Sequence, residues 1–106
     1  LGFTFKGDCP DVRNTKIIDI VKELADFNMS VDVYDSWASP EEVKHEYDIA
    51  LINTIEQGQY DGIVLAVDHH EFKEWGVDKI RSYGKAQHIL YDVKHVLDPN
   101  QADIRL

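Results

Sequence analysis

Short apolar runs that alternate with helix-forming segments constrain this sequence more than any other feature. The clearest run, residues 62–67 (Gly-Ile-Val-Leu-Ala-Val), is uninterrupted, as expected for a strand buried on both faces of a parallel sheet. Similar runs occur at residues 1–5, 31–34 and 88–93, and segments with helical periodicity separate them. Strands and helices that alternate in this way form a parallel sheet covered by helices. The sequence therefore predicts an α/β fold.

The segments between the runs carry signals for helix starts and ends. Asn14 or Thr15 can cap a helix with regularly spaced apolar residues, and Asn28 can end it in a left-handed conformation. Ser39, followed by proline and glutamates, predicts the start of another helix. Residues 49–58 fit either an edge strand or an irregular connection. We expect helices at residues 17–24, 39–47, 71–75 and 77–83, with a break at Gly76. These elements predict a three-layer α/β/α sandwich around a Rossmann-like, mostly parallel open sheet.

Length and charge limit the classes of protein that the chain can belong to. Its 106 residues suffice for one hydrophobic core, so we expect residues 1–106 to form a single domain. The net charge of -9 argues against a general binder of nucleic acid or of acidic membranes. A lone cysteine cannot form an internal disulfide, and no apolar run is long enough to span a bilayer. We expect a cytoplasmic protein that binds neither nucleic acid nor membrane.

The start of the chain carries its own signal. The sequence has no initiator methionine and opens inside an apolar run. We therefore expect the chain to be a fragment of a longer protein.

Polar side chains follow each predicted strand. These residues are Lys6, Asp35, Trp37, His69 and Lys94. In open α/β sheets, ligands bind outside the carboxyl ends of the strands, where such side chains converge. The same pattern also fits ordinary polar loops with no ligand, so both interpretations stay open.

The loop between the first predicted strand and helix is the strongest candidate for a binding site. Phe5 can stack on a planar base while the Lys6 ammonium reaches an oxygen of a base, sugar or phosphate. The alternative is that Phe5 belongs to the core and Lys6 is solvated. Arg13 can bind phosphate near the helix start, or pair with Asp8 or Asp11 in its own loop, which is the role we favour.

Other reactive side chains in the sequence give weaker signals. Residues 68–71 (Asp-His-His-Glu) contain metal-ligand types, but they are adjacent and no His-x-x-x-His or Cys-x-x-Cys spacing occurs, so we expect no metal. Cys9 could be a nucleophile, but it lacks an identifiable partner base, so we favour a small packed or partly exposed thiol. No Gly-x-Gly-x-x-Gly or Walker loop is present. The chain itself is therefore expected to bind no dinucleotide cofactor.

Four segments in order resemble motifs of one enzyme family. Residues 1–16 resemble its G-(L/F)-(T/A)-F-K-x-(N/D)-(C/T)-x-D-x-R-(N/E)-(S/T) motif, and residues 31–37 its V-x-(V/I)-Y-D-P-x segment, with Ser36 in place of the common proline. Residues 66–72 and 91–97 resemble its A-V-x-H-x-E-F and D-x-(K/R)-x-(V/L)-L segments. The family is that of the UDP-glucose/GDP-mannose (nucleotide-sugar) 6-dehydrogenases. The matching part is its C-terminal UDP-binding domain.

The resemblance implies a function and specific site residues. Such enzymes use NAD to oxidise the sugar C6 hydroxyl to a carboxylate for polysaccharide biosynthesis, and the variant motifs are similar to the branch that acts on UDP-N-acetylhexosamines. Phe5, Lys6 and Lys94 would bind the UDP-sugar, whereas Asp11 and Arg13 would hold the loop. The NAD domain, the central helix and the catalytic cysteine lie upstream in the family, so this fragment alone should be inactive. The full-length enzyme is expected to be a homo-oligomer.

Two alternatives remain at this point. The first is a non-catalytic, flavodoxin-like interaction or regulatory domain whose polar strand ends have no ligand. The second keeps the family but replaces the base, with GDP-mannose as the substrate. Competition between UDP and GDP separates the second alternative from the main prediction.

Overall fold

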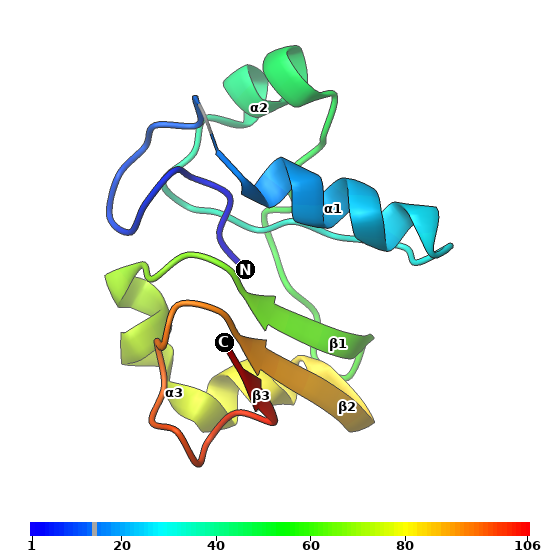
Figure 1. The fold of residues 1–106 in the computed structure, drawn as a ribbon, viewed down its shortest axis with the longest axis vertical. Coiled ribbons are helices and arrows are strands. Elements are labelled where there is room, and N and C mark those ends of the chain that lie inside the picture. Colours follow the sequence, from blue (N-terminus) through cyan, green and yellow to red (C-terminus); the bar gives the residue numbers. More distant parts are fainter. Residues whose placement is uncertain (14) are drawn as a thin grey trace.

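The elements of the fold are described for residues 1–13 and 15–106 of the computed structural model, so the candidate cap Asn14 lies outside the described residues. The helices are α1 (Ile17–Asp26), α2 (Pro40–Tyr47) and α3 (His70–Ser82), and the strands are β1 (Tyr60–Leu65), β2 (Gly84–Asp92) and β3 (Ile104–Arg105) (Figure 1). Every predicted helix is confirmed, including the break in α3 at Gly76, where φ is 76°. Residues 49–58 form no helix or strand.

The local helix signals act as expected. The Ser39 hydroxyl accepts a hydrogen bond from the Glu42 N–H at 3.3 Å, and Asn28 ends α1 with a φ of 63°. The Thr15 hydroxyl accepts from the Ile17 N–H at 3.2 Å and donates to the Phe3 carbonyl at 2.7 Å. Thr15 therefore ties the start of α1 to the opening segment of the chain.

The strands form a parallel sheet in the order β1-β2-β3 within the described part of the chain. Leu65 of β1 lies opposite Asp92 of β2, and Arg105 of β3 lies opposite Asp92 on its other side. Helix α3 connects β1 to β2, as a parallel crossover requires. The α/β class with a Rossmann-like parallel sheet is confirmed. The carboxyl ends of the strands meet at one edge, called here the carboxyl edge.

Side chains of β1 alternate between the two faces of the sheet. Ile63 and Leu65 pack with Phe72 and Ile80 of α3 in one apolar cluster. Val64, between them, points to the opposite face, where it borders a hollow beneath α1. Helices α1 and α3 thus lie on opposite faces of β1, which gives three layers.

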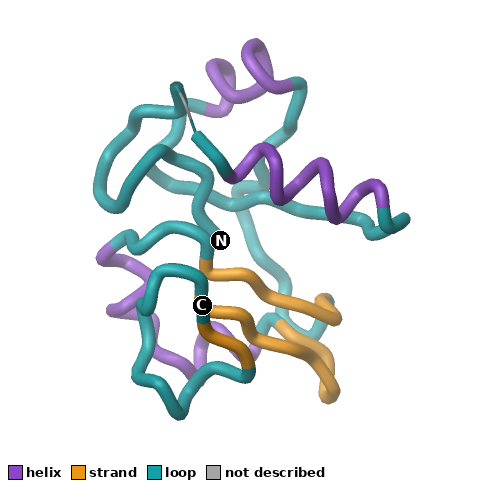
Figure 2. The backbone as a smooth tube through the Cα atoms, in the orientation of Figure 1, coloured by secondary structure: helices purple, strands orange, loops and turns teal. Residues whose placement is uncertain are grey.

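The predictions of regular strands at residues 1–5 and 31–34 are wrong. Both segments are loops without a continuous ladder of hydrogen bonds. The chain start lies beside β1, and residues 31–34 lie on its other side, away from β1 (Figure 2). The Leu1 carbonyl accepts a hydrogen bond from the N–H of Ala66, the residue after β1, at 2.9 Å. The Gly2 N–H donates to the Tyr34 carbonyl at 2.8 Å. Through these two contacts, residues 1 and 2 link residues 31–34 to the end of β1.

The reason for this difference lies in the N–H groups of residues 3–5. Those of Phe3 and Thr4 donate to the Asp35 carboxylate at 2.7 and 3.0 Å, and that of Phe5 donates to the Asp11 carbonyl at 2.7 Å. A strand needs these donors for its neighbour. Because a side chain and a loop carbonyl accept them instead, the strand cannot extend beyond Gly2.

In the described part of the chain, no helix combines the length and the apolar content that crossing a bilayer requires.

Candidate functional site

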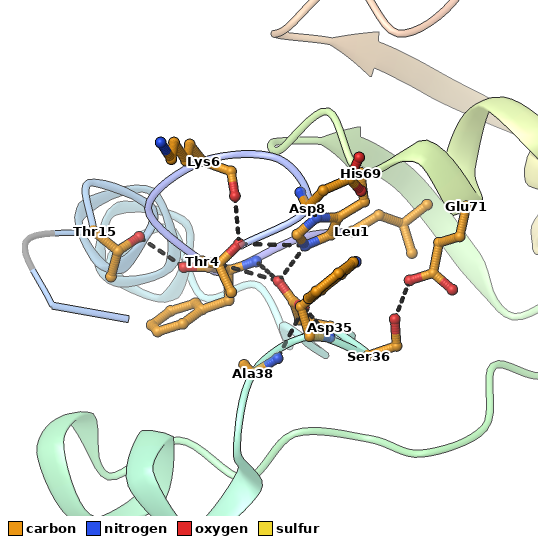
Figure 3. A network of polar contacts seen from close by, with 12 residues as sticks. Leu1, Thr4, Lys6, Asp8, Thr15, Asp35, Ser36, Ala38, His69 and Glu71 are labelled. Atoms are coloured by element: carbon orange, nitrogen blue, oxygen red, sulfur yellow. Dashed lines mark hydrogen bonds and ion pairs between the residues drawn. The ribbon is translucent and has the colours of Figure 1, made fainter. Parts of the chain in front are cut away.

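A buried aspartate organises the carboxyl edge of the domain. Within the described residues, five N–H groups converge on the Asp35 carboxylate, whose side chain is fully buried. Its Oδ2 accepts from the Phe3 and Thr4 N–H groups and from His69 Nε2, and its Oδ1 accepts from the N–H groups of Trp37 and Ala38 (Figure 3). The carboxylate thereby joins three segments of the chain that are distant in sequence.

These contacts decide the charge of Asp35. Burial raises the pKa of the carboxyl, but the hydrogen bonds from His69, Phe3 and Thr4 outweigh it and hold the pKa below its ordinary value. Asp35 is therefore a carboxylate at neutral pH. A neutral acid would need to donate a proton where every neighbouring group is already a donor.

His69 extends the network to the other side of the opening loop. The imidazole is fully buried, and its Nε2 lies 2.8 Å from Asp35 Oδ2. Its Nδ1 accepts from the Asp8 N–H at 2.9 Å, so the proton resides on Nε2 and is donated to Asp35. The Trp37 ring stacks over the imidazole, with ring centroids 6.2 Å apart. Both ring nitrogens are therefore occupied.

The opening loop, residues 4–13, is held at several points. The Thr4 hydroxyl donates to the Lys6 carbonyl at 3.0 Å, and Asp8 Oδ1 accepts from the His70 N–H at 2.8 Å. Gly7 lies against Asp68, because a Cβ at this position would come within 2.6 Å of the Asp68 carbonyl oxygen. Any larger residue at position 7 would push the loop away from the sheet.

The predicted substrate-binding side chains of this loop point outward. Phe5 is 54% exposed, which excludes the alternative that it belongs to the core. Lys6 is also exposed, and its side chain extends away from the network while its carbonyl faces Thr4 (Figure 3). The loop backbone is fixed, and the two side chains are free to meet a ligand. Their binding role stays a prediction.

The structure places the predicted loop pair Asp11 and Arg13 together at the surface. Arg13 Nε donates to Asp11 Oδ1 at 3.0 Å, and Nη2 donates to Oδ2 at 3.3 Å. The hydrogen bond from Arg13 lowers the pKa of Asp11. Because the Arg13 side chain is 79% exposed, water competes for this pair. The structural role assigned to the pair stays a prediction.

Lys94 lies in a second loop, residues 93–97, at the same carboxyl edge. The Val93 N–H donates to the Leu65 carbonyl at 3.1 Å, which places the loop beside the end of β1. Buried Asp92 accepts from the Val96 and Leu97 N–H groups at 2.9 and 2.8 Å. The opening loop and this loop lie at the same edge of the sheet (Figure 1). Lys94 is exposed there, and its role too stays a prediction.

Sequence reasoning missed what holds these loops. Asp35 and His69 were expected at strand ends, but not as partners of each other or of the opening loop. Asp92 was expected inside a strand. A signal was present, since each aspartate follows a tyrosine at the end of an apolar run, at positions 34–35 and 91–92. An acid at the buried end of a strand needs N–H donors from a neighbouring loop.

Two features of the described residues concern metal and dinucleotide binding. No group of three or more metal-ligating side chains gathers in residues 1–13 and 15–106. In a dinucleotide-binding domain, a glycine-rich turn between strand and helix receives the pyrophosphate. Here the turn from β1 to α3 runs through Val67, Asp68 and the buried His69 and contains no glycine.

The site at the carboxyl edge is open. A hollow of about 800 Å³ lies elsewhere, between α1 and β1, with apolar walls, and none of the predicted substrate-binding residues lines it. Phe5, Lys6 and Lys94 are all exposed. A ligand bound by these three side chains would therefore be covered by this chain on one side only.

The fold and the edge define an α/β domain of the nucleotide-binding type, with a fixed loop that presents an aromatic and a cationic side chain. A comparison with protein families matches residues 1–99 to the UDP-glucose/GDP-mannose dehydrogenase family, UDP binding domain. The chain belongs to this family and corresponds to its UDP binding domain. The alternative of an unrelated flavodoxin-like interaction domain is thereby wrong.

Individual relatives agree with the family match. The chain is 55% identical over 106 residues to UDP-N-acetyl-D-glucosamine 6-dehydrogenase of Pseudomonas aeruginosa, and 50% identical over 106 residues to the protein of the same name in Salmonella typhi. Each alignment covers 100% of this chain and 25% of the relative. Protein CapL of Staphylococcus aureus is 36% identical over 104 residues, covering 98% of this chain and 24% of CapL. The chain thus spans about a quarter of the length of these curated relatives.

Proposed function

We propose that residues 1–106 form the UDP-sugar-binding domain of an NAD-dependent nucleotide-sugar 6-dehydrogenase. The full-length enzyme oxidises the C6 hydroxyl of a UDP-N-acetylhexosamine to a carboxylate, for polysaccharide biosynthesis. The family match supports the nucleotide, and the names of the relatives with 55% and 50% identity support the N-acetylated sugar. The enzyme is a cytoplasmic homo-oligomer that needs neither nucleic acid nor a membrane.

One observation carries this proposal. The opening loop is fixed at the carboxyl edge by Asp35 and His69, while Phe5 and Lys6 project from it into solvent. An aromatic face can stack on the uracil ring, and an ammonium group can neutralise an oxygen of the diphosphate. Lys94, from the second loop, adds a further cation at the same edge.

The contribution of this domain to the reaction is orientation. Holding the uridine diphosphate at a rigid edge fixes where the sugar C6 lies relative to the reacting groups, and such positioning removes several kcal/mol from a barrier. The turn between β1 and α3 has no glycine-rich motif, and the sequence offers free Cys9 no identifiable partner base. We therefore assign NAD binding and the catalytic cysteine to another part of the full-length protein.

Calorimetric titration of the full-length protein with UDP and GDP tests the proposal. We expect UDP to bind and to compete with the UDP-sugar, and GDP to bind at least about tenfold more weakly, the difference of about 1.4 kcal/mol that one lost base contact produces. Tighter binding of GDP would instead favour GDP-mannose as the substrate. No heat with either nucleotide, from a protein with native circular dichroism, would contradict the proposal.

A further inference from the structure

We propose that His69 is a positioning residue for nucleotide binding, because it fixes both ends of the turn that presents Phe5 and Lys6. This inference rests on the proposed function. His69 itself is fully buried and does not reach the ligand. It acts through Asp35 on one side of the turn and through Asp8 on the other.

The end of the turn that precedes Phe5 is held through Asp35. His69 Nε2 donates to Asp35 Oδ2 at 2.8 Å, and the same oxygen accepts from the Phe3 and Thr4 N–H groups at 2.7 and 3.0 Å. The imidazole thus orients the carboxylate oxygen that receives the backbone immediately before Phe5. A rotation of this carboxylate would release residues 3 and 4 together.

The other end of the turn is held by the second ring nitrogen. His69 Nδ1 accepts from the Asp8 N–H at 2.9 Å, two residues after Lys6. Asp8 has a φ of 53°, a left-handed conformation that is costly outside glycine and that this contact stabilises. Asp8 Oδ1 in turn accepts from the His70 N–H at 2.8 Å, so the loop and the start of α3 are joined in both directions.

Residues between the two ends of the turn also contact His69 or its neighbour Asp68. The Thr4 hydroxyl lies 3.3 Å from His69 Nε2 and donates to the Lys6 carbonyl at 3.0 Å. Gly7 lies directly against Asp68, the residue before His69. The position of the Lys6 backbone is therefore coupled to the imidazole.

The imidazole serves both ends at once because its accepting and its donating nitrogen lie on different sides of the ring. Glutamine also has one donor and one acceptor group, but with its NH₂ near the Nε2 position its carbonyl oxygen does not lie at the Nδ1 position, so the Asp8 N–H loses its acceptor. His69→Gln should therefore keep the Asp35 contact and release the end of the turn that follows Lys6. The exposed side chains of Phe5 and Lys6 would then lose their fixed direction.

A double-mutant cycle in the full-length protein tests this inference. The UDP dissociation constant is measured by calorimetry for wild type, Lys6→Ala, His69→Gln and the double variant. We expect His69→Gln to raise it about tenfold, as the loss of one buried hydrogen bond would. In the Lys6→Ala background the same substitution should raise it less than about threefold, because residues that act through one another are not additive.

Steady-state kinetics separate a positioning role from a general folding defect. A folding defect lowers the amount of active enzyme and hence the apparent kcat, but it leaves KM for the UDP-sugar unchanged. His69→Gln should raise KM for the UDP-sugar by a larger factor than it lowers kcat, and it should leave KM for NAD near the wild-type value. Lys85→Ala, at the opposite end of β2, is the matched control and should change neither constant. If His69→Gln fails to fold, Thr4→Val replaces it in the cycle, because it removes the hydroxyl that links the imidazole to Lys6.

The outcomes separate this inference from the proposed function. If wild type binds UDP and Lys6→Ala weakens it, while the substitution at position 69 or 4 changes binding less than twofold, the inference is wrong and the proposed function stands. Full additivity of the two substitutions would also overturn the inference. If wild type binds no UDP, both are wrong.

Discussion

The opening loop (residues 4–13) and the second loop (residues 93–97) meet at the same carboxyl edge, yet they are held differently. Each carries an exposed lysine and each is fixed by a buried aspartate. Asp92 receives N–H groups four and five residues further along its own chain. Asp35 receives N–H groups from the opening segment, more than thirty residues away, together with His69.

The two loops therefore depend on different parts of the chain for their conformation. The two hydrogen bonds to Asp92 that fold the second loop join near neighbours in the sequence, and the bond from the Val93 N–H to the Leu65 carbonyl places this loop beside β1. The opening loop exists only when segments around residues 4, 35 and 69 have come together. Loss of its central carboxylate should therefore disturb the whole edge, whereas loss of Asp92 should disturb one loop.

The largest expected effect comes from Asp35→Asn. An amide has one acceptor oxygen and one donor group, so in either orientation its NH₂ faces N–H groups that lose their acceptor. We expect the free energy of unfolding to fall by about 3 kcal/mol, as when a buried charged partner is removed. Urea unfolding measures this, with exposed Asp26→Asn as the matched control. A loss no larger than that of the control would show that Asp35 does not hold the edge.

The contribution of Asp35 should also depend on pH. Its pKa is depressed in the fold, so the unfolded chain, with a pKa of about 3.9, takes up the proton at higher pH than the folded chain does. The stabilisation is complete above that value and is lost as the pH falls through the folded pKa. The stability difference between wild type and Asp35→Asn should therefore narrow below about pH 4. A constant difference from pH 7 to pH 3 would contradict the assignment.

A smaller effect is expected from Asp92→Asn. The amide oxygen can still accept one of the two N–H groups, and within the described residues the hydrogen bonds to this carboxylate come from Val96 and Leu97 of the same loop. We expect a loss of about 1.5 kcal/mol in the free energy of unfolding, typical of a buried hydrogen bond. Amide hydrogen exchange should speed up at Val96 and Leu97 and stay unchanged at Phe3 and Thr4. Faster amide exchange at Phe3 and Thr4 as well would contradict the view that Asp92 holds only the second loop.

The smallest effect is expected from Arg13→Ala. Its ion pair with Asp11 is exposed at the rim of the opening loop, and water can replace the lost contacts. The urea midpoint should match that of wild type within the precision of the measurement. A clear loss of stability would show that the loop depends on its surface pair as well as on its buried network.

The sequence predicted those parts of the fold that depend on near neighbours. Helix α2 follows from Ser39 and the residues after it, and the break in α3 follows from Gly76, because caps and glycines act locally. The runs at residues 1–5 and 31–34 indicated strands, and the structure has loops in their place. They could not indicate that Asp35 would take the N–H groups of Phe3 and Thr4, since that contact exists only in the folded molecule.

In the candidate site too, contacts between residues distant in sequence could not be predicted. Phe5, Lys6 and Lys94 could be selected from residue type and position at strand ends, and the structure places all three on the surface of one edge. The pairing of His69 with Asp35 and Asp8 could not be selected, because nothing in the sequence joins these positions. Exposed candidate residues were thus easier to select from the sequence than the buried residues that hold their loops.

The most direct test of the account is the UDP affinity of Lys6→Ala compared with that of Lys85→Ala. Both substitutions remove one exposed lysine, but Lys6 lies at the carboxyl edge and Lys85 near the amino end of β2. Calorimetry should show UDP binding weakened about tenfold by Lys6→Ala, as for loss of one charge-assisted contact, and unchanged by Lys85→Ala. Equal affinities in the two variants would contradict a nucleotide site at the opening loop.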